Sequence, residues 1–558
     1  MSRTNPSRNQ IRLIDRLIEN RIKNKPHAAR FFLYIANTVY FPFYEVKDQG
    51  TPPYDRPTLV ALILYGLYKG RILSDSIIAL AKENLGGIYI LGKLSIPSYK
   101  TVERVIDDIL DNIDLFFHQV LELCIKFDLV GGNKAFIDGT KTKANASKHK
   151  AMSYDYLNKK IDSTKEQIKE SLEEITDYFS GFENLSDEDF FELLKSESIR
   201  LHQKYWQIHQ QKLNERQKAI FSGQELEKIG AVSDTVEEHL NIFELIDENT
   251  DDEIIETMDI AGLKAERLET MEQKKEQLEK NWQKENGNKK IPDKTQINFT
   301  DPQSAIMVTK HHGVQQCYNN FGLVDAKAHV ILGTHTTNIS NDKQSYIPTI
   351  LEVMNNLGSI DNMIIGADAG FFSATNIKYS QDNDIDFYVS IPESKSPYGK
   401  DKFVYDEEND QYTCPEGEIL TPGKRISDHD KTRCYKTEAC KNCPVQSECT
   451  KAKDGIRKIR RNLKEDKLRE KAKEKAFSPK GREILKERKS VPEPVWGNLK
   501  QQDGLDQLHY RGLDKASKEF KLRCVMHNLR KLLKVFINNT EARNQIIAMG
   551  ATPTANVA

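Results

Sequence analysis

The sequence predicts a mixed α/β protein in which an all-α domain precedes one sheet and a long helical insertion interrupts it. Three observations support this fold class. The first 130 residues follow a helical periodicity, and residues 131–140 then change to a short apolar run that is typical of a strand. Residues 154–285 return to a helical pattern. Strand patterns reappear after residue 299 and alternate with helices, which indicates a mixed sheet.

The charge of the chain is unevenly distributed. The chain has 558 residues and a net charge of −1, so its length suggests several domains. Residues 161–280 carry 31 acids and 14 bases, whereas residues 451–535 carry 26 bases and 12 acids. This asymmetry indicates a part that faces nucleic acid and a separate acidic part, although solvated helix faces have the same composition.

The sequence gives no sign of secretion or membrane insertion. The first ten residues, MSRTNPSRNQ, lack the apolar segment of a signal peptide. The longest apolar run, LVALILYGLY, is too short to span a bilayer. We therefore expect an intracellular protein with no membrane partner.

Residues 1–130 are expected to form the helical N-terminal domain. PTLVALILYGLYKG has a proline near a helix start. The stretch from Ser95 has a turn at Pro97 and Ser98, a capping-type Thr101 and then a long amphipathic pattern. This arrangement is compatible with a DNA-binding helix-turn-helix variant, and a plain helical bundle explains it equally well.

The first strand of the core is expected within residues 131–153, where GGNKAFIDGT is a short apolar run after two glycines. Residues 154–298 are expected to form a coiled-coil-like helical insertion, because acids and bases interleave at i, i+4 spacing over most of this region. A solvated spacer would explain the outer part of the insertion as well.

The core is expected to continue over residues 299–399. A hairpin is predicted to turn near Asp325 to Lys327, followed by a helix that ends at a glycine and by the strand NMIIGADAGFF. A basic helical part of the core is expected over 456–540, and residues 541–558 are expected to be a disordered tail.

Three acids stand where catalysis is expected. Asp138 and Asp368 each end an apolar strand, and functional sites of open α/β sheets gather at the carboxyl ends of strands. Glu493 lies in a basic stretch between Arg488 and Lys500. Two-metal phosphoryl chemistry needs hard oxygen ligands that converge from separate elements, which these acids can supply. Taken singly, each acid is more typical of a surface or capping carboxylate.

Basic residues accompany these acids. Lys141, Lys143 and Lys148 follow Asp138 and are candidates for contacts with DNA phosphates, as are Arg488 and Lys500. Solvent-facing cations would have the same pattern.

Five of the eight cysteines fall between Cys414 and Cys449, which indicates a local metal site rather than a secreted disulfide scaffold. Within this segment, C-x₂-C-x₅-C is formed by Cys440, Cys443 and Cys449, and Cys414 precedes it. Four thiolates make a closed tetrahedral Zn²⁺ site, so we expect structural zinc in a zinc-ribbon-like insert over 400–455. Cys434 is a spare that fits in place of Cys414 or Cys449, and a redox role or free thiols stay open.

Three segments resemble the conserved blocks of bacterial insertion-sequence transposases of the DDE class: FIDGTKTKANASKHKAMSY, ADAGFF and RKSVPEPVWGNLK…YRGLDKASKEFKLRCVMHNLRKLL. The cysteine segment and the helical stretch from Pro53 to Gly92 are similar to further parts of that family, so the resemblance spans most of residues 50–535. It implies a ribonuclease H-like catalytic core with Asp138, Asp368 and Glu493 as its catalytic triad.

The third segment is similar to the family's signature of tyrosine, arginine, glutamate and lysine. Arg488 and Lys500 match its two basic positions around Glu493, but Leu485 stands where the tyrosine is expected. No tyrosine role is therefore carried over. Trp496, three residues after Glu493, is expected to pack in the core rather than to stack on a displaced base.

The resemblance implies a DNA transposase that binds the terminal repeats of an insertion sequence and catalyses DNA strand cleavage and strand transfer. Mg²⁺ (or Mn²⁺) would be held by the triad. Element ends and target DNA would be the partners, in the bacterial cytoplasm and associated with the nucleoid, and a dimer on DNA is expected because two ends must meet. The alternatives are a catalytically silent DNA-binding protein derived from such a transposase, a nuclease that cuts without joining, and a helical partner-binding scaffold.

Overall fold

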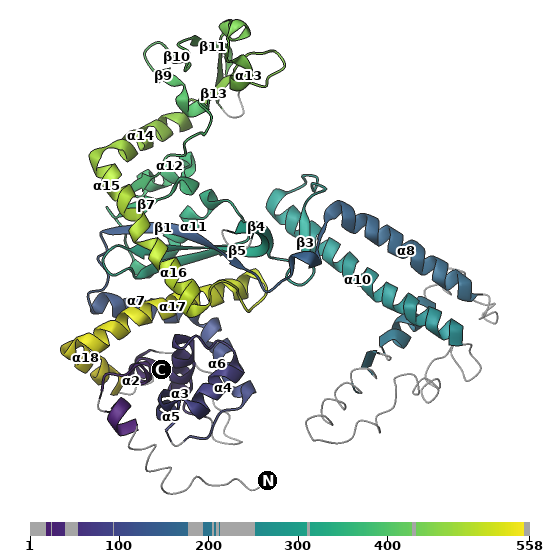
Figure 1. Cartoon of the computed structure of the whole chain (residues 1–558), viewed down its shortest axis with the longest axis vertical. Coiled ribbons are helices and arrows are strands. Elements are labelled where there is room, and N and C mark those ends of the chain that lie inside the picture. Colours follow the sequence, from purple (N-terminus) through teal and green to yellow (C-terminus); the bar gives the residue numbers. More distant parts are fainter. Residues whose placement is uncertain are drawn as a thin grey trace. The chain divides into compact units, whose positions relative to one another are not determined.

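The computed structural model describes most of the chain. The chain divides into two compact units (Figure 1). The first unit comprises Met1–Asn145 and Met307–Ala558, and the second unit comprises Ala146–Ile306. The described residues are 18–23, 25–39, 54–92, 94–176, 194–203, 206, 207, 211, 252–309, 313–426 and 431–551.

The N-terminal part of the first unit is helical. After a short π-helical turn, η1 (Glu19–Lys23), its helices are α2 (Ala28–Thr38), α3 (Arg56–Tyr68), α4 (Ser74–Glu83), α5 (Leu85–Leu91), α6 (Tyr99–Asp111) and α7 (Ile113–Lys126). Helix α3 starts where the Asp55 carboxylate accepts the Thr58 N–H at 3.0 Å, with a proline in its first turn. Because Leu59–Leu67 is buried on all sides, α3 forms the centre of this helical part.

Helix α6 is capped one turn earlier than the sequence suggests. The Ser98 hydroxyl accepts the Thr101 N–H at 3.2 Å, so Ser98 is the N-cap residue and Thr101 lies inside the first turn. The expectation that Thr101 itself caps the helix was wrong. Both residues are favourable at a helix start, and the cap position is set by where the extended backbone turns helical.

A mixed six-stranded sheet forms the core of the first unit. Its strands are β1 (Lys134–Lys143), β4 (Ala305–Thr309), β5 (Gly313–Asp325), β6 (Ile331–Thr337), β7 (Ile364–Ala367) and β8 (Asp386–Val389). The order is β4-β5-β1-β7-β8, and β6 also pairs with β5. Strand β1 runs antiparallel to β5 and parallel to β7, and β7 runs parallel to β8. The prediction of a mixed sheet with helices is confirmed.

The hairpin between β5 and β6 turns where the sequence predicts. Asp325 ends β5, and its carboxylate accepts the backbone N–H groups of Gly131, Gly132 and Lys327 at 2.9–3.0 Å. One buried side chain thereby fixes both the turn after β5 and the chain that enters β1.

Helices pack against the sheet from several parts of the chain (Figure 1). They are α11 (Tyr346–Leu357), α12 (Ala374–Asp382), α14 (Glu465–Phe477), α15 (Pro479–Glu487), α16 (Pro492–Asp503) and α17 (Leu513–Asn538). The last helix, α18 (Thr540–Ala551), packs on α2 and α17 instead. Helix α11 packs on β5 and β6, α16 on β1, and α15 on β7 and β8. Helix α17 contacts both the sheet and α7, which explains why most of its residues are buried.

The C-terminal segment is partly helical. Residues 541–551, which we assigned to a disordered tail, belong to α18, so that assignment was wrong for them. Ala542 and Ile546 are buried on this helix, and α18 packs against α2. An apolar face with a partner stabilises a short helix whose own propensity is modest. The rest of the predicted tail, 552–558, lies outside the described residues.

The second unit contains the helical insertion. It consists of η2 (Lys148–Lys150), β2 (Ala151–Ser153), α8 (Tyr154–Thr176), α10 (Asp252–Asn286) and β3 (Gln296–Asn298), with a further helical segment over 194–203. Helices α8 and α10 pack together, and β2 pairs antiparallel with β3. Buried apolar residues recur on α10 at spacings of three or four, as at Ile255, Met258, Ala261 and Ala265. This stripe gives the unit its own core.

The cysteine-rich insert forms a separate five-stranded sheet. Its strands are β9 (Val404–Asp406), β10 (Gln411–Thr413), β11 (Ile419–Ile426), β12 (Thr432–Lys436) and β13 (Ile459–Asn462), in the order β13-β12-β11-β10-β9. The sheet therefore reaches Asn462, beyond the predicted boundary at residue 455. The basic stretch that follows β13 is the one that forms α14 and α15.

Candidate active site

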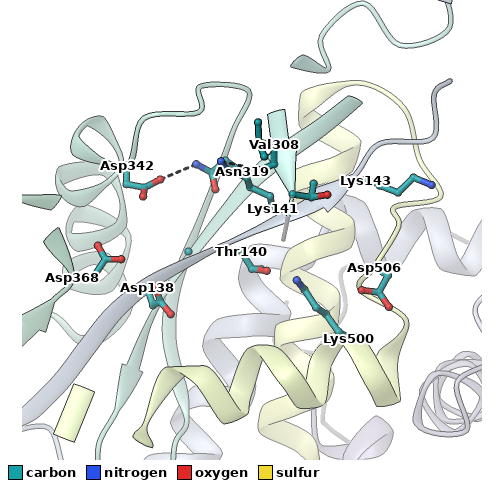
Figure 2. Close-up of a pocket in the computed structure, with 12 residues that line it drawn as sticks. Asp138, Thr140, Lys141, Lys143, Val308, Asn319, Asp342, Asp368, Lys500 and Asp506 are labelled. Carbon is teal, nitrogen blue, oxygen red and sulfur yellow. Dashed lines mark hydrogen bonds between the residues drawn. The ribbon is translucent and has the colours of Figure 1, made fainter. Parts of the chain in front are cut away.

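The register of two parallel strands brings Asp138 and Asp368 together. Ile137 of β1 pairs with Ala367, the last residue of β7. Asp138 directly follows Ile137, and Asp368 directly follows Ala367. The two carboxylates therefore stand side by side where the parallel pairing of β1 with β7 ends. Asp368 directly follows β7, but Asp138 lies in the middle of β1, so the prediction that Asp138 ends its strand was wrong: pairing with β5 continues β1 to Lys143. Figure 2 shows both at the same end of a cavity.

Glycine after Asp138 has a packing reason. A Cβ atom on Gly139 would lie 2.5 Å from the ring of Phe321 on the neighbouring strand β5. The glycine thus leaves room for the Phe321 ring beside the part of β1 that carries Asp138. Phe321 in turn meets Phe371 edge to face, with their ring centroids 5.8 Å apart.

Asp368 begins a short 3₁₀ turn, η7 (Ala369–Phe371). Its Oδ1 accepts the Gly370 N–H at 2.8 Å. Because Phe371 at the end of this turn is buried, the turn is anchored in the core and fixes the orientation of the Asp368 carboxylate.

Glu493 lies in the first turn of α16 and is exposed. Lys500 follows seven residues later, so the two side chains share one face of the helix, and Gly497 between them has no side chain. Trp496, one turn after Glu493, is 5% exposed and packs against Phe520, which anchors this part of the helix in the core. The prediction that Trp496 packs in the core is confirmed.

Five of the predicted residues line one cavity of about 270 Å³: Asp138, Asp368, Lys141, Lys143 and Lys500 (Figure 2). Asp138 and Asp368 stand at one end of the cavity, and Lys143 and Lys500 stand at the other end together with one carboxylate, Asp506. Glu493 and Arg488 do not line it, but both are close enough to act electrostatically on Asp138. Lys148 belongs to the second unit, where it lies exposed in η2, so its predicted phosphate contact stays a prediction.

Burial raises the pKa of Asp138 to about 6, and the negative charges of Asp368 and Glu493 add to the rise. The Gly139 N–H and Arg488 oppose this shift. In the absence of a metal ion, burial and the neighbouring negative charges disfavour the ionised form of Asp138, and a bound cation would offset this free-energy cost.

Sequence reasoning missed three polar residues that line the same cavity, Asn319, Asp342 and Asp506. The Asn319 amide donates to Asp342 Oδ1 at 3.0 Å. Burial raises the pKa of Asp342, and the charge of Asp368 raises it further. In the sequence, Asp342 is one acid in a polar turn before a helix, and nothing local distinguishes it from a capping residue.

The acids fit a hard divalent cation by the chemistry of their donors, because carboxylate oxygens are the ligands that Mg²⁺ takes in proteins. In the part of the chain that the structure describes, no group of three or more His, Cys, Asp or Glu side chains is arranged to hold a metal ion. Mutual repulsion keeps like-charged carboxylates apart, so a bound cation would draw them together.

Four of the five clustered cysteines surround a second, small cavity of about 30 Å³, namely Cys414, Cys440, Cys443 and Cys449. Cys434 does not line this cavity; it lies in β12, paired with Arg460 of β13. The Cys414 sulfur accepts the Glu418 N–H at 3.3 Å. Burial raises the pKa of Cys449, and the other three thiols raise it further while Arg457 opposes them. These four sulfurs suit a soft cation such as Zn²⁺ by donor type.

Residues 413–533 match the family model of a transposase DDE domain. The resemblance to transposases of the DDE class is confirmed. The matched segment contains Arg488, Glu493 and Lys500, together with all five clustered cysteines. Asp138 and Asp368 lie before it. A transposase domain of this class acts on DNA, which makes DNA the expected partner of this chain.

The other comparisons add no relatives. No curated protein and no solved structure matches the chain. None of the described helices is long and apolar enough to cross a membrane.

Proposed function

We propose that this protein is a DNA transposase that binds the terminal repeats of an insertion sequence and carries out metal-dependent strand cleavage and strand transfer. Asp138, Asp368 and Glu493 form its catalytic triad on a ribonuclease H-like core. One observation supports this proposal above all. The first two acids lie side by side where the parallel pairing of β1 with β7 ends, in a cavity that Lys143 and Lys500 also line.

In this proposal the carboxylates hold Mg²⁺ or Mn²⁺. Bound divalent cations supply activation of the attacking water and stabilisation of the leaving 3′ oxygen. Asp138 and Asp368 contribute from fixed positions, because one lies on a central strand and the other caps an anchored turn. Glu493 approaches from the first turn of α16, on the helix face that it shares with Lys500.

The basic residues position the DNA. Lys141, Lys143 and Lys500 bind the phosphates on either side of the scissile bond, since they line the cavity beside the acids. Arg488, whose charge favours the ionised form of Asp138, contacts phosphate as well. Lys148, which is exposed in η2 of the second unit, is a further residue that we assign to phosphate binding.

We assign the remaining parts by the same reasoning. The helical N-terminal part binds the terminal repeats, and the protein dimerises on DNA so that two ends are held together. Cys414, Cys440, Cys443 and Cys449 hold a structural Zn²⁺ that stabilises the insert, because four thiolates leave no coordination position for catalysis.

Cleavage of a labelled duplex that carries the flanking terminal repeats tests the proposal. Wild type should cut at the repeat ends with Mg²⁺ and not with EDTA, and Asp138→Asn, Asp368→Asn and Glu493→Gln should each lose cutting while repeat binding persists. Joined products then distinguish a transposase from a nuclease. Wild type that binds the repeats and never cuts would refute the enzyme and favour a silent DNA-binding protein. Cutting that survives one substitution would remove that acid from the triad.

A further inference from the structure

We propose that Asp342 is a fourth carboxylate of the metal site, which binds the divalent cation together with Asp368. The inference rests on the proposed function, and it adds a residue that neither the sequence motifs nor the family match includes. It is drawn from the placement of Asp342, its lack of an ion pair and the glycine beside it.

Asp342 faces the acidic end of the cavity. It lies in the 3₁₀ turn η6 (Asp342–Gln344), which packs against η7, the turn that starts at Asp368. Figure 2 shows its carboxylate pointing toward the cavity that Asp138 and Asp368 also line. Three separate elements, β1, η6 and η7, therefore bring one aspartate each to the same end of one cavity.

The Asp342 carboxylate has no structural task that explains it. The turn η6 is capped by Asn341, whose side chain accepts the Lys343 N–H at 3.1 Å. Among the described residues, no Lys, Arg or His forms an ion pair with Asp342, and the charge of Lys141 offsets only part of the rise in its pKa that burial and Asp368 cause. A partly buried carboxylate that faces another carboxylate without a cationic partner is costly, and a bound cation offsets that cost.

Asn319 orients this carboxylate. Its side chain is 2% exposed, and its amide donates to Asp342 Oδ1 at 3.0 Å and to the Ile339 carbonyl at 3.2 Å. With Oδ1 held in this way, Oδ2 is the atom left to bind a ligand. A hydrogen bond from a buried side chain to a carboxylate that binds metal is the usual way in which proteins fix ligand direction.

Gly370 lets Asp342 and Asp368 approach each other. A Cβ atom on Gly370 would lie 2.6 Å from Asp342 Oδ2 and 2.9 Å from Asp368 Oδ1. Both oxygens thus flank the same small residue, and any larger residue would force at least one of them to move. Two carboxylate oxygens from different turns thus lie beside the same glycine, from which a bound cation could draw both as ligands.

Titration of the full chain with Mn²⁺, followed by calorimetry and by the electron paramagnetic resonance of the bound ion, tests the inference without DNA. Asp342→Asn should weaken Mn²⁺ binding at least about tenfold. Asp342→Glu, which keeps the charge, should recover part of it. Gly370→Ala keeps all the carboxylates but separates two of them, and it should weaken binding as well. Asp506→Asn is the matched control, because it makes the same substitution at the lysine end of the same cavity.

The outcomes separate this inference from the proposed function. Mn²⁺ binding that is unchanged in Asp342→Asn but lost in Asp368→Asn would overturn the role of Asp342 and leave the transposase proposal intact. Equal losses in Asp342→Asn and Asp506→Asn would also overturn it, because any lost charge would then have the same effect. Failure of wild type to cut DNA would refute the proposed function, whereas the Mn²⁺ titration would still decide the role of Asp342.

Discussion

Replacing Asp138 with asparagine should stabilise the metal-free protein at neutral pH, although it should abolish cleavage. Burial and the neighbouring acids raise the pKa of Asp138 from 3.8 to about 6. The folded protein therefore binds the Asp138 proton more tightly than the unfolded chain does. The stability that this proton contributes is fully present below about pH 4, the pKa in the unfolded chain, and is lost as the pH rises through about 6.

The size of the effect follows from the shift. One pKa unit corresponds to about 1.4 kcal/mol, so a rise from 3.8 to about 6 amounts to about 3 kcal/mol between acidic and neutral solution. Asparagine carries no charge at either pH. The free energy of unfolding of Asp138→Asn relative to wild type should therefore increase by up to about 3 kcal/mol between about pH 4 and pH 7.5.

Thermal unfolding of both proteins in EDTA over this pH range measures the difference. Asp361→Asn serves as the control, because Asp361 is exposed and outside the cavity. Mg²⁺ should then reverse the order, since it stabilises wild type and not the variant. A difference between Asp138→Asn and wild type that does not change with pH would refute the reasoning that burial and repulsion act on this carboxyl.

Three further predictions follow from other parts of the first unit. Glu519→Ala should lower the free energy of unfolding by about 3 kcal/mol or more, because Glu519 pairs with the buried Arg523 and accepts the backbone N–H of His509 at 2.8 Å. A loss below about 1 kcal/mol, measured by chemical denaturation, would contradict this. Cys440→Ser should lose the zinc that elemental analysis detects in wild type, whereas Cys434→Ser should retain it, and equal contents would refute the four-cysteine site. Lys500→Ala should weaken DNA binding and reduce the salt dependence of log K by about one unit of slope, and an unchanged slope in a salt titration would exclude the phosphate contact.

Much of the fold follows from local patterns in the sequence. The apolar run after two glycines predicts strand β1, and the turn residues around Asp325 predict the hairpin of β5 and β6. The helix α11 ends at Gly358, whose positive φ of 79° is the conformation that glycine adopts most readily. These features depend on side-chain periodicity and on residues that stop a helix or strand, and both are readable without knowing the partner of each element.

Features that depend on a distant partner were not predictable. Helix α18 was assigned to a disordered tail, because only its contact with α2 reveals its apolar face. The choice between Cys434 and the other cysteines stayed open in the sequence. In the structure, the pairing of β12 with β13 leaves Cys434 outside the small cavity that the other four share.

The sequence by itself determined that Asp138 and Asp368 each follow an apolar strand segment, and hence the two candidate positions, because an apolar run is a local property of the chain. It did not show that β1 continues past Asp138, which depends on pairing with β5. Only the tertiary structure decided that these two acids are neighbours, since their proximity comes from the parallel register of β1 and β7. It also placed Asp342 at the same cavity. That third position depends on the packing of one short turn against another and on a glycine between them, and neither leaves a periodic signal in the sequence.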